Sequence, residues 1–188
     1  MTDWIHRALP HHEETNVVFF RGMTLDALTR GLLAQHRMPL AYGKGTDWGL
    51  LMHDMLSWEE NDYDVVGYGP LSAGGGELVV FVTEPCSVKG HRPSFEYHRD
   101  GHLITAFSFE ALSQPWGEQP DLLSPALMAA RLTGPAADLD STGNTLRTAQ
   151  AITDFFALPD LAYDEVVAPG GTGGHGTSAS SGSSVSSS

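Results

Sequence analysis

The dipeptide Asp100-Gly101 lies between two segments in which polar and apolar residues alternate, and it constrains the fold more than any other feature. Both central residues of a type I′ turn need positive φ, and Asp-Gly meets that need, so the flanking segments are predicted to form an antiparallel hairpin. The apolar run from Leu78 to Val82 supplies a further strand. We therefore expect three adjoining strands between residues 77 and 109.

The two-residue turn also predicts which side chains share a face of the sheet. If Arg99 opposes His102, then Tyr97 opposes Ile104 and Phe95 opposes Ala106, and these residues are predicted to face the core. The opposite face is expected to meet water or a partner, and it carries Ser94, Glu96, His98, Leu103, Thr105 and Phe107.

The remaining pattern predicts two more strands and several helices. Residues 16–20 form a short β-branched and aromatic run, and Thr24 can cap a helix that ends near His36. We expect a buried helix over 48–58, a strand over 63–68 and helices over 121–132 and 144–157. The predicted fold class is α+β, with a single antiparallel sheet of about four to five strands and helices packed on one face.

The chain divides into three parts by composition. Residues 1–14 are predicted to form an N-terminal arm, and 15–167 a single α+β domain large enough to bury its own core. Residues 168–188 are rich in Gly and Ser and carry no charged side chain. We expect this tail to be disordered, because it cannot bury enough apolar surface to offset the entropy of ordering.

The charge balance limits the classes of partner. The chain has 10 Lys and Arg against 23 Asp and Glu, a formal net charge of -13. Nucleic acids are recognised through clustered Lys and Arg, so we expect no nucleic acid partner and no anionic membrane. An acidic surface can attract another protein, for which a basic one is the natural candidate.

Cysteine content and hydropathy point to a cytoplasmic protein. Cys86 is the single cysteine and cannot form an internal disulfide, and the N-terminal residues lack the apolar core of a signal peptide. The apolar run at 78–82 is far too short to cross a bilayer.

Several polar residues are candidates for a chemical site. Glu96 and His98 share a strand face and could support acid-base chemistry under a covering cleft, and Cys86 with His91 could form a thiolate pair. His98 and His102 fall on opposite faces of the hairpin, so we expect no metal site there. The glycines of 43–49 match neither the P-loop nor the dinucleotide fingerprint, and we expect no cofactor.

Trp116 is the remaining candidate for binding. This large aromatic residue lies between Pro115 and Gly117 in a loop after the hairpin. It is either a lid that closes the core against Leu112, Leu122 and Leu123 or an exposed anchor for a partner.

Three short motifs suggest a family. Phe19-Phe-Arg-Gly22, Gly90-His-Arg-Pro93 and Trp116-Gly-Glu-Gln-Pro-Asp121 follow one another across residues 15–165. Together they resemble an actinobacterial domain-of-unknown-function family whose members carry Phe-x-Arg-Gly, Gly-x-Arg-Pro and Trp-Gly-x-x-Pro-Asp. The resemblance implies an α+β fold and a bacterial cytoplasmic setting, and it implies no active site.

Taken together, these features favour a non-enzymatic protein-binding or regulatory domain, immunity-like or accessory, with Trp116, Glu96, His98 and Thr105 as binding residues. One alternative is a small hydrolase or transferase that uses Glu96, His98 and the Cys86 and His91 loop. Another is a structural component of an assembly, tethered by the Gly/Ser tail.

Overall fold

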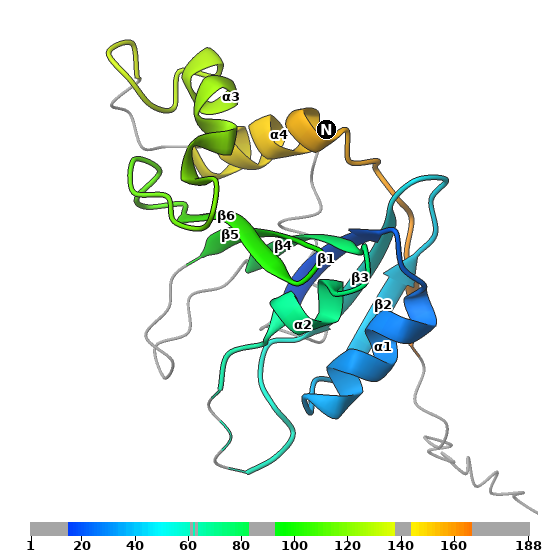
Figure 1. Ribbon diagram of the computed structural model, residues 1–188. Helices are drawn as coiled ribbons and strands as arrows, with labels where there is room; N and C mark the ends of the chain where they lie inside the picture. Colours follow the sequence, from blue (N-terminus) through cyan, green and yellow to red (C-terminus); the bar gives the residue numbers. More distant parts are fainter. Residues whose placement is uncertain (1–14, 61, 63, 83–92, 138–143, 167–188) are drawn as a thin grey trace, which may run out of the picture.

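A computed structural model describes residues 15–60, 62, 64–82, 93–137 and 144–166 (Figure 1). The predicted arm, the predicted tail, Cys86 and His91 lie outside these residues. The elements in chain order are β1 Thr15–Arg21, α1 Leu25–Ala34, β2 Pro39–Gly43, β3 Gly49–Asp54, α2 Tyr68–Ser72, β4 Glu77–Val82, β5 Ser94–Arg99, β6 His102–Ser108, the 3-10 helix η2 Pro120–Leu123, α3 Ser124–Ala129, α4 Asn144–Phe156 and β7 Asp164–Glu165.

The strands form one antiparallel sheet in the order β6-β5-β4-β1-β3-β2-β7. The prediction of a single antiparallel sheet in an α+β fold is confirmed. The prediction of four to five strands is wrong, because the sheet has seven. The strands that were missed are β2, β3 and β7, which lie together on one side of β1.

Helices cover both faces of this sheet, so the prediction of helices on one face is also wrong (Figure 1). Leu127 of α3 and Ile152 of α4 pack with Phe81 and Tyr97 in one core. On the other face, Leu28 of α1 and Tyr68 of α2 pack in a second core, together with alternate residues of β1 and β4. The physical reason lies in β1, whose residues 17–20 are all apolar and buried, so that each face needs its own cover.

The strand-to-helix unit at the N-terminal end of the described chain is confirmed. The hydroxyl of Thr24 accepts a hydrogen bond from the Ala27 N–H at 3.1 Å, and α1 begins at the next residue. Capping by Thr satisfies one of the backbone donors left unpaired at a helix start. Helix α1 ends at Ala34, two residues before the end predicted near His36. His36 has a positive φ.

The helix predicted over 48–58 is wrong, because residues 49–54 form β3. Leu50 and Met52 enter one core and Leu51 enters the other. A strand buried on both faces reads as a continuous apolar run, and its periodicity cannot be told from that of a buried helix. The strand predicted over 63–68 is wrong as well, since 64–67 are a loop and Tyr68 begins α2.

The hairpin at Asp100-Gly101 is confirmed, with φ of 49° and 88° at the two turn residues. Its register is only partly as predicted. Arg99 opposes His102, but a β-bulge then shifts the pairing, so that Tyr97 opposes Thr105 and Phe95 opposes Phe107. Strict alternation would place Ile104 and Phe107 on opposite faces. The bulge brings both into the core that contains α4.

The C-terminal helices agree with the sequence in outline. The segment predicted as one helix over 121–132 is the 3-10 turn η2 followed by α3, and α4 ends one residue before the predicted limit. None of the helices in the described part of the chain is long and apolar enough to cross a membrane.

Candidate functional site

The strand face that carries Ser94, Glu96 and His98 is not an open, solvated surface. These residues oppose Val82, Val80 and Leu78 of β4, on the side of the sheet covered by α1 and α2. His98 is only 6% exposed. Sequence analysis correctly placed the three residues on one face, but it missed the layer that covers them.

Thr105 does not belong to this group. The bulge pairs it with Tyr97, so it lies on the opposite face of the sheet, where it is fully buried. Its hydroxyl donates a hydrogen bond to the Pro120 carbonyl at 3.2 Å. Thr105 therefore holds η2 against β6, and its prediction as a binding residue on the Glu96 face is wrong in position.

Glu96 and His98 form a close pair. His98 Nε2 lies 2.8 Å from Glu96 Oε2, and Nδ1 of the same ring is buried with no hydrogen-bond partner among the described residues. A buried N–H without an acceptor is costly, so the favoured tautomer carries its hydrogen on Nε2 and donates it to the carboxylate. His98 thereby fixes the orientation of Glu96.

A second polar chain lies beside this pair and was missed from the sequence. Asn16 of β1 and His53 of β3 are directly opposite each other, and the hydroxyl of Tyr68 from α2 lies between their side chains. Tyr68 Oη is 2.9 Å from His53 Nε2 and 2.8 Å from Asn16 Nδ2. The Tyr68 ring also stacks at a tilt against His98, with centroids 5.8 Å apart.

The direction of each hydrogen bond among Asn16, Tyr68 and His53 follows from the hydrogen bond that His53 makes with Asp54. His53 Nδ1 lies 2.8 Å from the Asp54 carbonyl, which can only accept, so Nδ1 carries the hydrogen. Burial lowers the pKa of His53 to about 4, so the ring is neutral at pH 7 and Nε2 accepts from the Tyr68 hydroxyl. Burial also raises the pKa of Tyr68 far above its ordinary value, which keeps the phenol protonated.

Asn16 is the last residue in this series of hydrogen bonds. Because the Tyr68 hydrogen goes to His53, Asn16 must use its NH₂ group as the donor to Tyr68, and the amide orientation is fixed. The carbonyl Oδ1 is then left buried, with no hydrogen-bond partner among the described residues. An acceptor left unpaired in this way costs free energy, and a bound donor would recover it.

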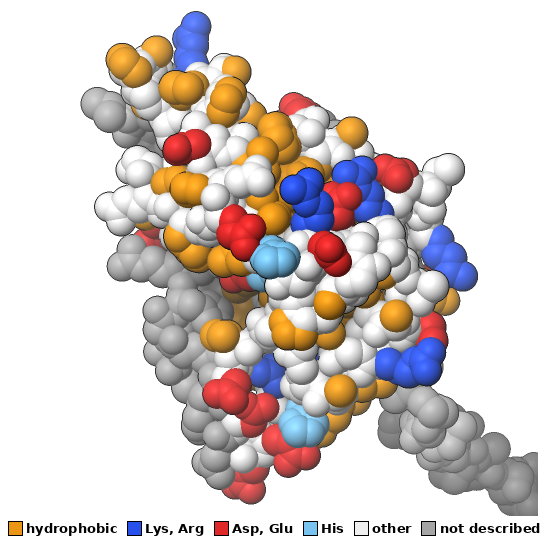
Figure 2. Space-filling view, in the orientation of Figure 1, with side chains coloured by type: hydrophobic (Ala, Val, Ile, Leu, Met, Phe, Trp, Pro, Cys, Tyr) orange, Lys and Arg blue, Asp and Glu red, His pale blue; other side chains and the backbone are white. Residues whose placement is uncertain are grey.

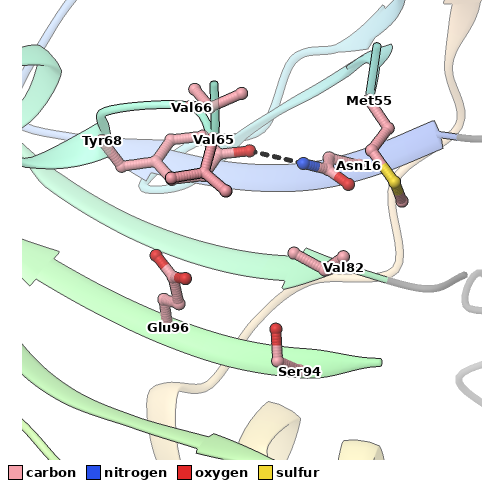
Figure 3. Close-up of a pocket in the computed structure, with 8 residues that line it drawn as sticks. All are labelled: Asn16, Met55, Val65, Val66, Tyr68, Val82, Ser94 and Glu96. Carbon is pink, nitrogen blue, oxygen red and sulfur yellow. Dashed lines mark hydrogen bonds between the residues drawn. The ribbon is translucent and has the colours of Figure 1, made fainter. Parts of the chain in front are cut away.

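A cavity of about 120 Å³ lies where these residues meet (Figure 3). We call it the inner cavity, and it is lined by Asn16, Met55, Val65, Val66, Tyr68, Val82, Ser94 and Glu96. Figure 3 shows the Asn16 carbonyl oxygen turned away from the Tyr68 hydroxyl, on the side that faces Val82. The inner cavity is smaller than the roughly 300–1,000 Å³ typical of sites for larger ligands.

Beside the inner cavity, the segment 54–67 forms what we call the acidic loop, described at 54–60, 62 and 64–67. Its described carboxylates are Asp54, Glu59, Glu60, Asp62 and Asp64. In Figure 2 acidic side chains gather at the end of the molecule where Figure 1 places this loop.

A buried arginine holds the acidic loop in place. The guanidinium of Arg37 donates to the Asp64 carbonyl at 2.6 Å and to the Asp62 carboxylate at 3.3 Å. A hydrogen bond from Ser57, the Asp64 N–H and Arg37 together lower the pKa of Asp62 to about 2. The carboxylate of Asp62 is therefore ionised throughout the neutral range, where it pairs with Arg37.

Three large apolar side chains in the described part of the same loop are exposed, and Leu56 is the least exposed of them at 37%. Trp58 is 47% exposed and Val65 is 70% exposed. The Trp58 ring stacks at a tilt on His36 with centroids 5.5 Å apart, and its backbone N–H donates to the His36 carbonyl at 3.1 Å. The loop thus presents apolar groups on a supported backbone, surrounded by carboxylates.

The structure contradicts one of the two sequence interpretations of Trp116, the lid that closes the core. Its backbone N–H and C=O exchange hydrogen bonds with Ala106, which extends the outer edge of β6. The indole is 46% exposed, so it does not close the core as a lid would. Its use as an anchor for a partner stays a prediction.

Of the remaining candidates, His102 is described and lies apart from the Glu96 and His98 pair. His102 is exposed and pairs with Glu118 at 2.6 Å, away from His98, so the two histidines are on opposite faces as predicted. Among the described residues, no three His, Cys, Asp or Glu side chains converge as metal ligands. Cys86 and His91 lie outside the described residues, so their pairing stays a prediction.

The fold and this site define an α+β domain with a two-faced antiparallel sheet and a polar cavity under an acidic loop. Comparison of the chain with protein-family models, with curated proteins and with solved structures returned no match. The resemblance to the actinobacterial family therefore stays a prediction.

Proposed function

We propose that this chain is a non-enzymatic protein-binding domain, accessory or immunity-like, whose acidic loop recognises a basic partner. The observation that carries the proposal is a supported loop that combines exposed Trp58 and Val65 with several carboxylates. Aromatic side chains supply much of the energy at protein interfaces, and surrounding charges steer the encounter and select the partner. A basic surface with an apolar patch is complementary to this loop.

The hydrogen bonds from Arg37 to Asp62 and Asp64 support the use of this loop as a binding surface. Arg37 is anchored to the loop by two hydrogen bonds, and Asp62 remains charged in that arrangement. A loop already in its bound conformation loses less conformational entropy when a partner docks.

The enzymatic alternative has less support. Glu96 and His98 do lie together at a cavity, as that alternative requires, but the cavity holds about 120 Å³ and Tyr68 and His53 use their hydrogen bonds on each other. The third possibility, a tether formed by the tail, rests on residues outside those described.

The proposal is tested by measuring the binding of a fluorescent basic peptide to the full-length protein. The peptide carries Lys at alternate positions and one Leu. We expect binding that weakens as salt concentration rises, since exposed charges are screened. The double variant Glu59→Gln, Glu60→Gln should weaken binding roughly fivefold at low salt, given about 0.2–1 kcal/mol for each exposed pair.

The matched control is the double variant Asp164→Asn, Glu165→Gln. It removes the same charge from two adjacent exposed carboxylates on β7. We expect it to bind as the unmodified protein does. Equal weakening by both double variants would mean that net charge alone acts, and the loop would lose its proposed role.

A further inference from the structure

We propose that the inner cavity receives the ammonium end of a lysine side chain from the basic partner. This inference rests on the proposed function, because the acidic loop is what brings the partner to the cavity. Met55, Val65 and Val66 belong both to the acidic loop and to the cavity wall. A side chain from a partner docked on the loop therefore has the cavity beside it.

The polar atoms of the cavity call for a donor. Asn16 Oδ1 is buried and unpartnered among the described residues, and the Glu96 carboxylate can only accept. The Tyr68 hydroxyl has already given its hydrogen to His53, so it offers no donor to an anion. Among the described lining residues, Ser94 has a hydroxyl that can adapt to either role. These groups fit a ligand with several N–H donors and a positive charge.

The walls and the size of the inner cavity further restrict the kind of ligand that fits. Met55, Val65, Val66 and Val82 give the cavity hydrocarbon surfaces that suit an alkyl chain. A lysine ammonium is a compact charge with three donors on a flexible four-carbon stem, whereas a guanidinium is planar and wider. The Tyr68 ring adds an aromatic wall, to which cations are attracted.

His98 acts here as a positioning residue. It donates from Nε2 to Glu96 Oε2 and leaves the other carboxylate oxygen for the ligand. The hydrogen bond also sets the direction of Glu96, and Figure 3 shows that carboxylate turned toward Tyr68.

The experiment uses full-length protein and three peptides of equal length and charge, which carry lysine, arginine or trimethyl-lysine. All three keep the positive charge that the acidic loop attracts, but only the lysine peptide supplies a compact group with N–H donors. We expect the lysine peptide to bind roughly tenfold more tightly than the trimethyl-lysine peptide, which is the effect of a charge-assisted hydrogen bond. The arginine peptide should bind more weakly than the lysine peptide.

The variant Glu96→Gln should reduce the preference for lysine to within about twofold, whereas Glu118→Gln should leave it unchanged. Glu118 is a matched control because it also pairs with a histidine, His102, but lies on the surface outside the cavity. Circular dichroism and thermal unfolding of both variants establish that each is folded.

The outcomes separate this inference from the proposed function. Equal binding of the three peptides, with weakening by the acidic-loop variant, would overturn the lysine site and keep the proposed function. Absence of binding by every peptide would contradict both. A preference for lysine that survives Glu96→Gln would also overturn the cavity as its source.

As a last arm, n-butylammonium chloride should compete with the lysine peptide only at millimolar concentration. Tight binding of the free amine would overturn the lysine site and indicate a small-molecule site instead.

Discussion

At the scale of single residues, His53 shows how the buried polar chain is coupled to pH. Its neutral ring accepts from Tyr68, and a proton on Nε2 would break that contact. In the unfolded chain the imidazole has an ordinary pKa of 6.5, and burial lowers the folded-state pKa to about 4. The unfolded chain therefore binds more protons between these two values, and the free energy of unfolding falls as the pH falls through that window.

We expect a loss of about 3 kcal/mol from this residue between pH 7 and pH 4. Urea unfolding at a series of pH values measures it. The variant His53→Gln should flatten the profile between pH 6.5 and 4.5, whereas the exposed control His102→Gln should not. An unchanged slope in His53→Gln would show that His53 is not the group that titrates.

Residue identity alone could not reveal the site. Asn16 reads as an ordinary polar position near the start of a strand, and His53 lies in a segment whose pattern predicts a helix. Their convergence depends on the pairing of β1 with β3 and on Tyr68, which lay in a segment predicted as a strand. Glu96 and His98 could be predicted as neighbours because strand alternation alone places them on one face.

At the scale of elements, the bulge in β6 decides which residues enter the core, and the loop around Gly117 supports it. The carbonyls of Leu103 and Ile104 accept hydrogen bonds from the N–H groups of Glu118 and Gln119. Gly117 has φ of +118°, and a Cβ atom there would lie 2.6 Å from the Ile104 carbonyl oxygen. Only glycine allows the loop to approach the bulge this closely.

Gly117→Ala is therefore expected to destabilise the protein by roughly 1–3 kcal/mol or more, measured by urea unfolding. Gly75→Ala is the matched control, since Gly75 has φ of +91° but no atom within 4 Å of a Cβ. It separates backbone strain from the steric clash. Equal effects of the two substitutions would contradict the close packing of this loop on β6.

The elements that the sequence predicts well are those with a local chemical signal. The cap at Thr24, the Asp100-Gly101 turn and the amphipathic pattern of α4 each depend on neighbouring residues. By contrast, β3 is buried on both faces and carries no alternation, and β7 is only two residues long. The bulge was not predictable from the hairpin because Glu118 and Gln119, which donate hydrogen bonds to it, lie outside the hairpin.

At the scale of the whole molecule, the sheet is covered on both faces and the proposed binding site lies at one end. The acidic loop and the inner cavity lie together there, and Arg37 and Tyr68 connect them to the second core. The net charge of -13 gives the molecule a field that favours cationic partners, and the loop gives that field a place to act. We propose that the whole surface attracts the partner and that the cavity selects it.

The most direct test of this account is chemical-shift mapping of isotope-labelled full-length protein during titration with the lysine peptide. We expect the largest perturbations at the backbone amides of 54–60 and 64–67, and at Asn16 and Glu96 beside the cavity, with the amides of α3 and α4 unchanged. Perturbations that centre on Trp116 or on α4, or that spread evenly over all exposed carboxylates, would contradict the acidic loop as the binding surface.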